Sequence, residues 1–115
     1  MALTKTAAEM VDPVALTTAS ASSVTPTPSN SQYNFTALAA TLTINAPTGV
    51  FLDGQKIIFR ILDNGTSQTL TWNATYTVIG TTLPTSTTIS KMLYVGCIYN
   101  AANTRWDVVA VTTQA

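Results

Sequence analysis

Few side chains in this sequence could perform catalysis. The chain contains one cysteine, Cys97, and no histidine. A cysteine nucleophile needs a neighbouring base or positive charge to lower its pKa, and histidine is the usual provider. Cys97 lies within an apolar run, where a small buried side chain is the simpler interpretation. Serine or cysteine catalysis that depends on histidine is therefore excluded, and so is a disulfide within the chain.

The carboxylates are too scattered to suggest a site. The five acidic residues are Glu9, Asp12, Asp53, Asp63 and Asp107. Glycoside hydrolysis needs two carboxylates across one bond, whereas Asp53 and Asp63 lie in turn-like sequences that favour aspartate locally. Asp53, Asp63, Asn64 and Asp107 could supply oxygen to calcium, but no EF-hand spacing is present. We expect no enzyme, no metal site and no cofactor.

Aromatic side chains leave one further option, a surface on which a sugar could stack. The candidates are Trp72, Trp106, Tyr76, Tyr94 and Tyr99. Both tryptophans fall on the inward phase of their predicted strands, so we expect them in the core. An exposed sugar-binding surface and subunit contacts remain the alternatives.

The composition favours association with other proteins. Only 9% of the 115 residues are charged, the five basic and five acidic residues cancel, and the mean hydropathy is +0.27. A disordered chain would be more polar, and a nucleic-acid-binding protein more basic. A monomer with so little charge is poorly protected against self-association, so we expect copies of itself or a larger assembly to cover its surface. Neither a signal peptide nor an apolar run of about 18 residues is visible.

The first third of the chain differs from the rest. Residues 13–52 contain no charged side chain, and residues 17–32 consist mainly of Ser, Thr, Ala, Pro and Asn. Such a stretch has little to bury, so it predicts an extended N-terminal arm over residues 1–32 and one domain over residues 33–115. Thr6 and Glu9 have capping-box spacing, which allows one or two helical turns around residues 7–11.

Residues 33–115 show the two-residue period of β-strands. Residues 41–45, 56–62 and 69–73 alternate apolar with polar or mixed positions. Residues 63–65 (DNG) predict a tight hairpin into residues 70–72, and residues 92–99 the sheet centre, paired with residues 106–111. The pattern predicts an all-β domain, a β-sandwich or jelly-roll-like barrel of about seven short strands.

Two groups of apolar residues have no evident partner in this domain. Ile58 and Leu62 lie on the outer face of their strand beside Lys56 and Arg60. The second group lies in the predicted arm. Together they give the predicted residues for capsid or subunit binding: Leu3, Met10, Val11, Val14, Leu16, Ile58 and Leu62.

Seven segments carry a resemblance to a known module. They are INAPTG (44–49), DGQKIIFRI (53–61), NG (64–65), LTW (70–72), LP (83–84), YVGCIYN (94–100) and WDVVA (106–110). Over residues 35–112 the chain resembles a small β-module of tailed-phage virion proteins, found in head decoration (cement) proteins and in distal domains of tail fibres. The resemblance implies a trimeric β-structure without catalysis.

The predicted function is therefore structural. We expect a homotrimeric capsid decoration protein, made in the host cytoplasm, that binds the major capsid protein on the outer surface of the phage head and stabilises it. The alternative is a receptor- or glycan-binding knob of a tail fibre. We expect neither nucleic acid nor membrane as a partner.

Overall fold

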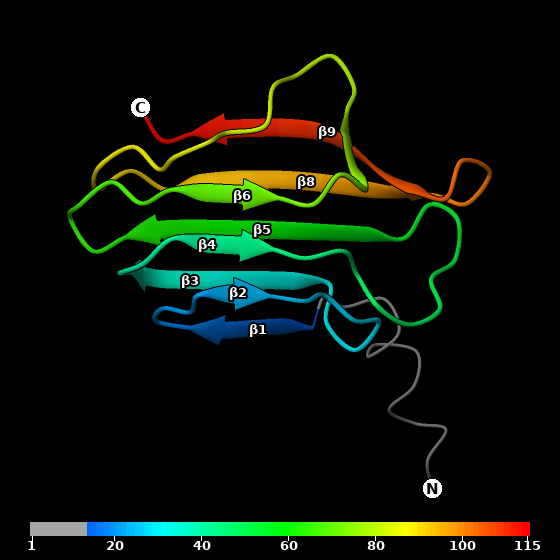
Figure 1. The fold of residues 1–115 in the computed structure, drawn as a ribbon, viewed down its shortest axis with the longest axis horizontal. Helices are drawn as coiled ribbons and strands as arrows, with labels where there is room; N and C mark the ends of the chain where they lie inside the picture. The colour runs from blue at the N-terminus through cyan, green and yellow to red at the C-terminus, as the bar shows by residue number, and fades with distance from the viewer. Residues whose placement is uncertain (1–13) are drawn as a thin grey trace, which may run out of the picture.

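A computed structural model describes residues 14–115, which form nine β-strands and no helix. The strands are β1 (Ala15–Thr18), β2 (Ser23–Val24), β3 (Gln32–Leu38), β4 (Leu42–Ile44), β5 (Lys56–Asp63), β6 (Leu70–Trp72), β7 (Tyr76–Val78), β8 (Leu93–Asn100) and β9 (Arg105–Thr113). They form a six-stranded sheet, in the order β1-β3-β5-β8-β9-β7, and a three-stranded sheet, in the order β2-β4-β6. The two sheets lie one over the other (Figure 1). The all-β prediction is confirmed.

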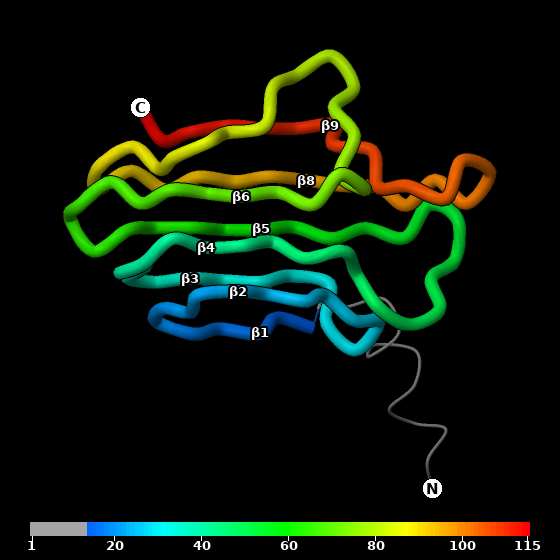
Figure 2. The backbone as a smooth tube through the Cα atoms, in the orientation of Figure 1, coloured from blue at the N-terminus to red at the C-terminus, as the bar shows by residue number. Residues whose placement is uncertain are grey.

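The first six strands form a flattened coil. The chain passes from the larger to the smaller sheet in each of the pairs β1–β2, β3–β4 and β5–β6, and then returns (Figure 2). Because each turn repeats the direction of the one before, β1, β3 and β5 pair in parallel, and so do β2, β4 and β6. Each turn of the coil therefore contributes one strand to each sheet, and each of these strands is hydrogen-bonded to the corresponding strand of the neighbouring turn.

The two-residue alternation determines which side chains enter the space between the sheets. On β5, Ile57, Phe59 and Ile61 are buried, whereas Lys56 and Ile58 are exposed. On β4 of the opposite sheet, Leu42 and Ile44 are fully buried. The inward phase predicted for both strands is confirmed.

The last two strands form the predicted hairpin. β8 pairs antiparallel with both β5 and β9, so it lies in the interior of the larger sheet as expected. β9 has β7 on its other side, in parallel pairing. The hairpin therefore separates β5 from β7, which precedes it in the chain.

Other sequence predictions about topology are not confirmed. The jelly-roll-like barrel needs antiparallel neighbours, whereas the coil supplies parallel ones. The turn at residues 63–65 does not close a hairpin, because β6 lies in the other sheet and pairs with β4. Gly65 does have the positive φ (97°) that the turn residues predicted.

The structure also differs from the predicted domain boundary at residue 33. Residues 15–18 and 23–24 are strands β1 and β2, and Pro26 is fully buried. The Tyr33 hydroxyl accepts a hydrogen bond from the Thr27 amide (2.9 Å) and lies 3.1 Å from the Asn30 carbonyl oxygen, to which it can donate. From residue 14 onward the predicted arm therefore belongs to the packed domain, held chiefly by backbone pairing.

Aromatic rings fill the middle of the core. Phe59 of β5 packs edge-to-face against Trp72 of β6 (centroids 5.5 Å apart) and against Tyr76 (6.0 Å). Trp106 is buried as predicted, whereas Trp72 is only partly buried and donates its indole N–H to the Pro84 carbonyl oxygen (2.8 Å). Such pairs contribute stability beyond the area they bury.

A buried carboxylate fastens the end of β5. Asp63 accepts hydrogen bonds from the Thr87 hydroxyl (2.7 Å), the Ser90 amide (3.0 Å) and the Gly65 amide (3.0 Å). Burial raises its pKa, but the hydrogen bonds to the ionised form outweigh that effect and hold the pKa below its usual range. Asp63 thus ties the 63–65 turn to residues 87–90.

Asp63→Asn should lower the free energy of unfolding by about 1–3 kcal/mol at neutral pH, since an amide cannot accept all three bonds. Because the folded-state pKa is depressed, the ionised group stabilises the fold above the unfolded pKa of about 3.9. That contribution is lost as the pH falls through this value towards the folded pKa. Urea unfolding between pH 3 and 7 should show a flatter pH dependence for the variant than for the wild type. The exposed Asp53→Asn is the control, and an Asp63→Asn profile equal to that of the control would contradict the assignment.

Candidate functional site

The predicted contact residues lie on separate surfaces. Val14 and Leu16 lie at the β1 edge of the larger sheet, and both are about half exposed. Ile58 and Leu62 lie on the outer face of β5. Leu3, Met10 and Val11 lie outside the described residues.

Strand register shows why Leu16 and Ile58 do not meet. Leu16 is the partner of Tyr33, which in turn pairs with the inward-facing Phe59. Ile58 is instead aligned with Gln32 on one side and Gly96 on the other. Leu16 therefore faces the space between the sheets, and Ile58 faces away from it.

The outer face of the larger sheet is mixed in character. Ile58 (36% exposed) and Tyr94 (41% exposed) are the most exposed of its large apolar side chains on β5 and β8, and Arg60 is paired opposite Tyr94. Gly96 is paired with Ile58 on one side and with Ala110 of β9 on the other, and the small residues Gly96 and Ala110 leave the sheet surface low there. This face offers a shallow contact area with one exposed aromatic ring.

The surroundings of Cys97 do not favour a role as a nucleophile. Its side chain is buried, and burial raises the pKa of the thiol to about 12. Among residues 14–115, no group of three or more His, Cys, Asp or Glu side chains is placed to hold a metal ion. In the same range no helix is long and apolar enough to cross a membrane.

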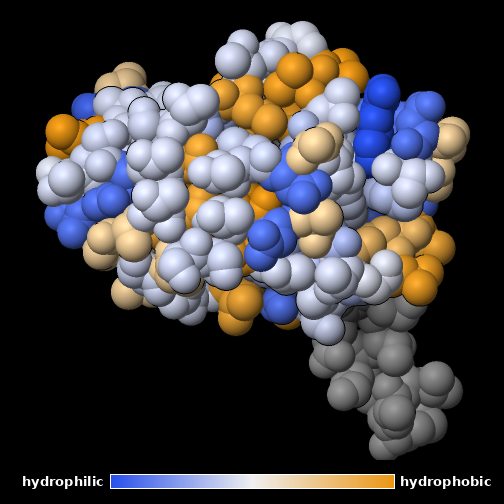
Figure 3. All heavy atoms as spheres, in the orientation of Figure 1, coloured by the Kyte–Doolittle hydropathy of each residue, from blue (hydrophilic) through white to orange (hydrophobic). Residues whose placement is uncertain are grey.

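Among residues 14–115, the most exposed large apolar side chains lie in a loop that sequence analysis treated only as a turn. Within residues 49–54, here called the apolar loop, Val50 is 85% exposed and Leu52 75% exposed. Figure 3 shows hydrophobic surface at the edge of the molecule where this loop lies in Figure 1. Three successive apolar residues, Val50, Phe51 and Leu52, between two glycines were the signal that could have revealed it.

The apolar loop is held rigidly from within. Phe51 points inward and packs edge-to-face on Trp106 (centroids 4.9 Å apart) and near Tyr99 (6.0 Å). The Leu52 amide donates to the Gln55 side-chain oxygen (3.0 Å), and the Gln55 amide donates back to the Leu52 carbonyl oxygen (3.1 Å). The anchored Phe51 thus leaves Val50 and Leu52 on a fixed support.

Two further bonds fasten the loop to the β8–β9 hairpin. The Gly54 amide donates to the Tyr99 carbonyl oxygen (2.9 Å), and the Asp53 carboxylate accepts from the Ala101 amide (3.0 Å). At its start, Gly49 has a φ of 103°, and a Cβ there would lie 2.7 Å from Cδ of Pro28. Only glycine suits both the backbone angle and this close approach.

A fixed apolar loop is suited to binding a protein. Apolar side chains that are already ordered lose little conformational entropy when a partner covers them. Exposed apolar clusters on a soluble domain are typical of interaction sites. The arrangement therefore identifies the apolar loop as the best candidate contact site among the described residues.

Comparisons with known proteins add no family assignment. No protein-family model, no curated protein and no solved structure matches the chain.

Proposed function

We propose that this protein is a capsid decoration protein of a tailed phage. In this proposal, a homotrimer binds the major capsid protein on the outer surface of the head and holds neighbouring capsid subunits together. The observation that carries the proposal is the apolar loop, whose exposed Val50 and Leu52 are fixed in place by Phe51 and by hydrogen bonds. The low content of charge supports burial of a large part of the surface in an assembly.

The subunit contacts of the trimer are proposed for the outer face of the larger sheet. Ile58 and Leu62 of β5 and Tyr94 of β8 provide apolar area there, and Lys56 and Arg60 border it. Interface cores combine apolar and aromatic side chains with arginine in this way. The apolar loop would remain free for the capsid.

A second candidate is the receptor- or glycan-binding knob of a tail fibre. The observation that favours it is Tyr94, which is 41% exposed and is paired with Arg60. The small residues Gly96 and Ala110 are the next outward-facing pair along β8 and β9. A ring so placed can stack on the apolar face of a sugar. A sugar bound to Tyr94 would occupy the outer face, so that face could not also form the trimer contact proposed above.

The test is sedimentation of the purified protein with undecorated phage heads. The wild type should coat heads, and the double variant Val50→Ser with Leu52→Ser should bind at least about tenfold more weakly, since burying each side chain contributes about 1.5–3 kcal/mol. Ile89→Ser, at a residue 54% exposed outside the apolar loop, is the matched control and should bind normally.

Coating by the double variant at wild-type affinity would remove the apolar loop from the proposal. Failure of the wild type to bind heads, together with binding to host cells that is lost in Tyr94→Ala, would favour the tail-fibre function instead.

A further inference from the structure

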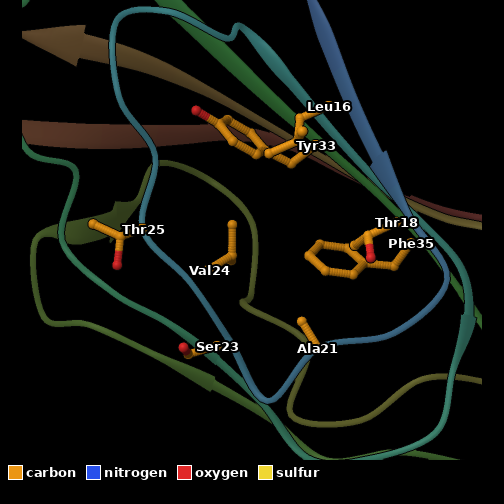
Figure 4. Close-up of a pocket in the computed structure, with 8 residues that line it drawn as sticks. All are labelled: Leu16, Thr18, Ala21, Ser23, Val24, Thr25, Tyr33 and Phe35. Carbon is orange, nitrogen blue, oxygen red and sulfur yellow. The ribbon is translucent and has the colours of Figure 1, made fainter.

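A cavity of about 240 Å³ lies between the sheets beside β1 and β2 (Figure 4). Apolar side chains and hydroxyl groups line it, so no charged side chain there would select a ligand. A group with a defined chemistry of its own lies elsewhere, in the turn that follows β5. It is Asn64, the one residue among the seven asparagines of the sequence that a glycine follows.

An asparagine before a glycine can lose its side-chain amide without an enzyme. The backbone nitrogen of Gly65, once its proton has passed to water or hydroxide, attacks Cγ of Asn64 and forms a new N–Cγ bond. The Cγ–Nδ2 bond breaks, and Nδ2 leaves as ammonia after taking up a proton. Water then opens the succinimide ring at either carbonyl, which leaves aspartate or isoaspartate at position 64. The reaction consumes water and releases ammonia, and nothing is oxidised or reduced.

Access to the two reacting groups is open. Asn64 and Gly65 are both exposed. Glycine has no Cβ to hinder the approach of its nitrogen, and no other atom lies within 4 Å of the place where a Cβ of Gly65 would be. Water and hydroxide therefore reach both groups.

The attacking nitrogen is nevertheless held by a carboxylate. The Gly65 amide donates its hydrogen to Oδ1 of Asp63 (3.0 Å). Removal of that hydrogen would leave a negative nitrogen next to a negative oxygen, which like-charge repulsion disfavours. Asp63 does not assist as a base either, because its hydrogen bonds hold its pKa below the usual range and an amide proton is far less acidic.

The side chain under attack has partners of its own. Oδ1 of Asn64 accepts hydrogen bonds from the Thr66 amide and from Nε2 of Gln68 (both 3.3 Å). The backbone amide of Asn64 donates to the Leu38 carbonyl oxygen (3.1 Å). These bonds restrict the rotations of side chain and main chain by which the Gly65 nitrogen and Cγ of Asn64 approach each other.

Asp63 can release the Gly65 amide only if a second segment also moves. Its Oδ2 accepts from the Thr87 hydroxyl (2.7 Å), and its Oδ1 also accepts from the Ser90 amide (3.0 Å). The Thr87 hydroxyl oxygen in turn accepts from the Gln68 amide (2.9 Å). Opening of the turn is therefore coupled to movement of residues 87–90, which makes the open state rare.

We infer that Asn64 is a deamidation site of this protein and that the Asp63 carboxylate restrains the reaction, so that it proceeds only while the turn at residues 63–68 is open. Aspartate at position 64 adds a second carboxylate beside Asp63, in a stretch (residues 64–90) without charged side chains. Isoaspartate adds a carbon to the main chain before Gly65. Either product weakens the bonds that close the turn, so an opening event leaves a permanent change. This inference is independent of the proposed function.

The first test compares deamidation in the folded and the unfolded wild-type protein at neutral pH. Mass spectrometry of digested peptides measures amide loss at each asparagine. Asn64 should react at least about tenfold more slowly in buffer than in guanidinium chloride, since the folded turn is open for a small fraction of the time. In guanidinium chloride it should react before the other six asparagines. An equal or higher rate in the folded protein would overturn the inference.

The second test separates the effect of Asp63 from that of general stability. Full-length Asp63→Ala, in conditions where its far-UV spectrum is that of the folded protein, should deamidate at Asn64 at least about fivefold faster than the wild type. Ile57→Ala is the matched control, because it removes a buried side chain at the other end of β5 and leaves the bonds of Asp63 in place. It should react at the wild-type rate.

Equal rates in the wild type and Asp63→Ala, or equal acceleration in both variants, would show that Asp63 does not restrain the reaction. If the alanine variant does not fold, Asp63→Asn gives the same comparison, because it removes the charge and keeps one acceptor oxygen.

Discussion

A chain that begins at residue 33 should not fold cooperatively. The truncation removes β1 and β2, which pair along β3 and β4, and it removes the fully buried Pro26. Tyr33 would lose the hydrogen-bond partners of its hydroxyl at Thr27 and Asn30. The end of the core formed by Tyr33 and Phe35 would then open to water. We expect a urea unfolding curve without a distinct transition, and strong dye binding.

A chain that begins at residue 14 is the control for this deletion. It retains all nine strands, so it should still unfold in one transition. A cooperative transition in the shorter chain at wild-type stability would show that residues 14–32 are an arm after all.

Phe59→Ala should lower the free energy of unfolding by about 3–5 kcal/mol, the usual range for deletion of a buried aromatic ring. Phe59 is fully buried and contacts the rings of Tyr33, Trp72 and Tyr76, so its removal leaves a cavity that none of these can fill alone. Urea unfolding measures the loss. The neighbouring residue gives a matched control: Ile58→Ala, on the outer face, should cost less than about 1 kcal/mol in the monomer. Equal losses would mean that the inward and outward faces of β5 are wrongly assigned.

The local features of the strands were predictable because they depend on neighbouring residues. The alternation of Ile57, Phe59 and Ile61 with Lys56 and Arg60 defines an inner and an outer face whichever strand pairs with β5. The pairing itself was not predictable, because a two-residue period is the same for parallel and antiparallel neighbours. A turn such as residues 63–65 also reverses the chain equally well within one sheet or between two.

The arm prediction failed because it counted apolar side chains alone. Residues 14–32 bury few of them, but backbone hydrogen bonds along β3 and β4 hold β1 and β2. Ala21 and Val24 pack against the core there, and the Thr48 amide donates to the carbonyl oxygen of the buried Pro26 (2.9 Å). Polar composition therefore did not distinguish a free segment from an edge strand.

The apolar loop was missed for a related reason. Gly49 and Gly54 marked the segment as a turn, and turns are expected to expose polar residues. Which of Val50, Phe51 and Leu52 enters the core depends on Trp106 and Tyr99, which are more than 40 residues away in the sequence. Only the tertiary structure shows that Phe51 is the anchor and that its two neighbours face solvent.

The position of the β8–β9 hairpin between β5 and β7 determines when the larger sheet can assemble during translation. A strand that emerges from the ribosome as β7 has no hydrogen-bonded neighbour in the larger sheet until β9, about 30 residues later, has also emerged. One edge of β5 is likewise unpaired until β8 has emerged and docked on it. The coil of β1 to β6 can form during translation, but the larger sheet can close only after translation of β9. Nascent or prematurely terminated chains that end between β7 and β8 therefore expose the unpaired edges of both β5 and β7, the state in which this protein is most prone to aggregate.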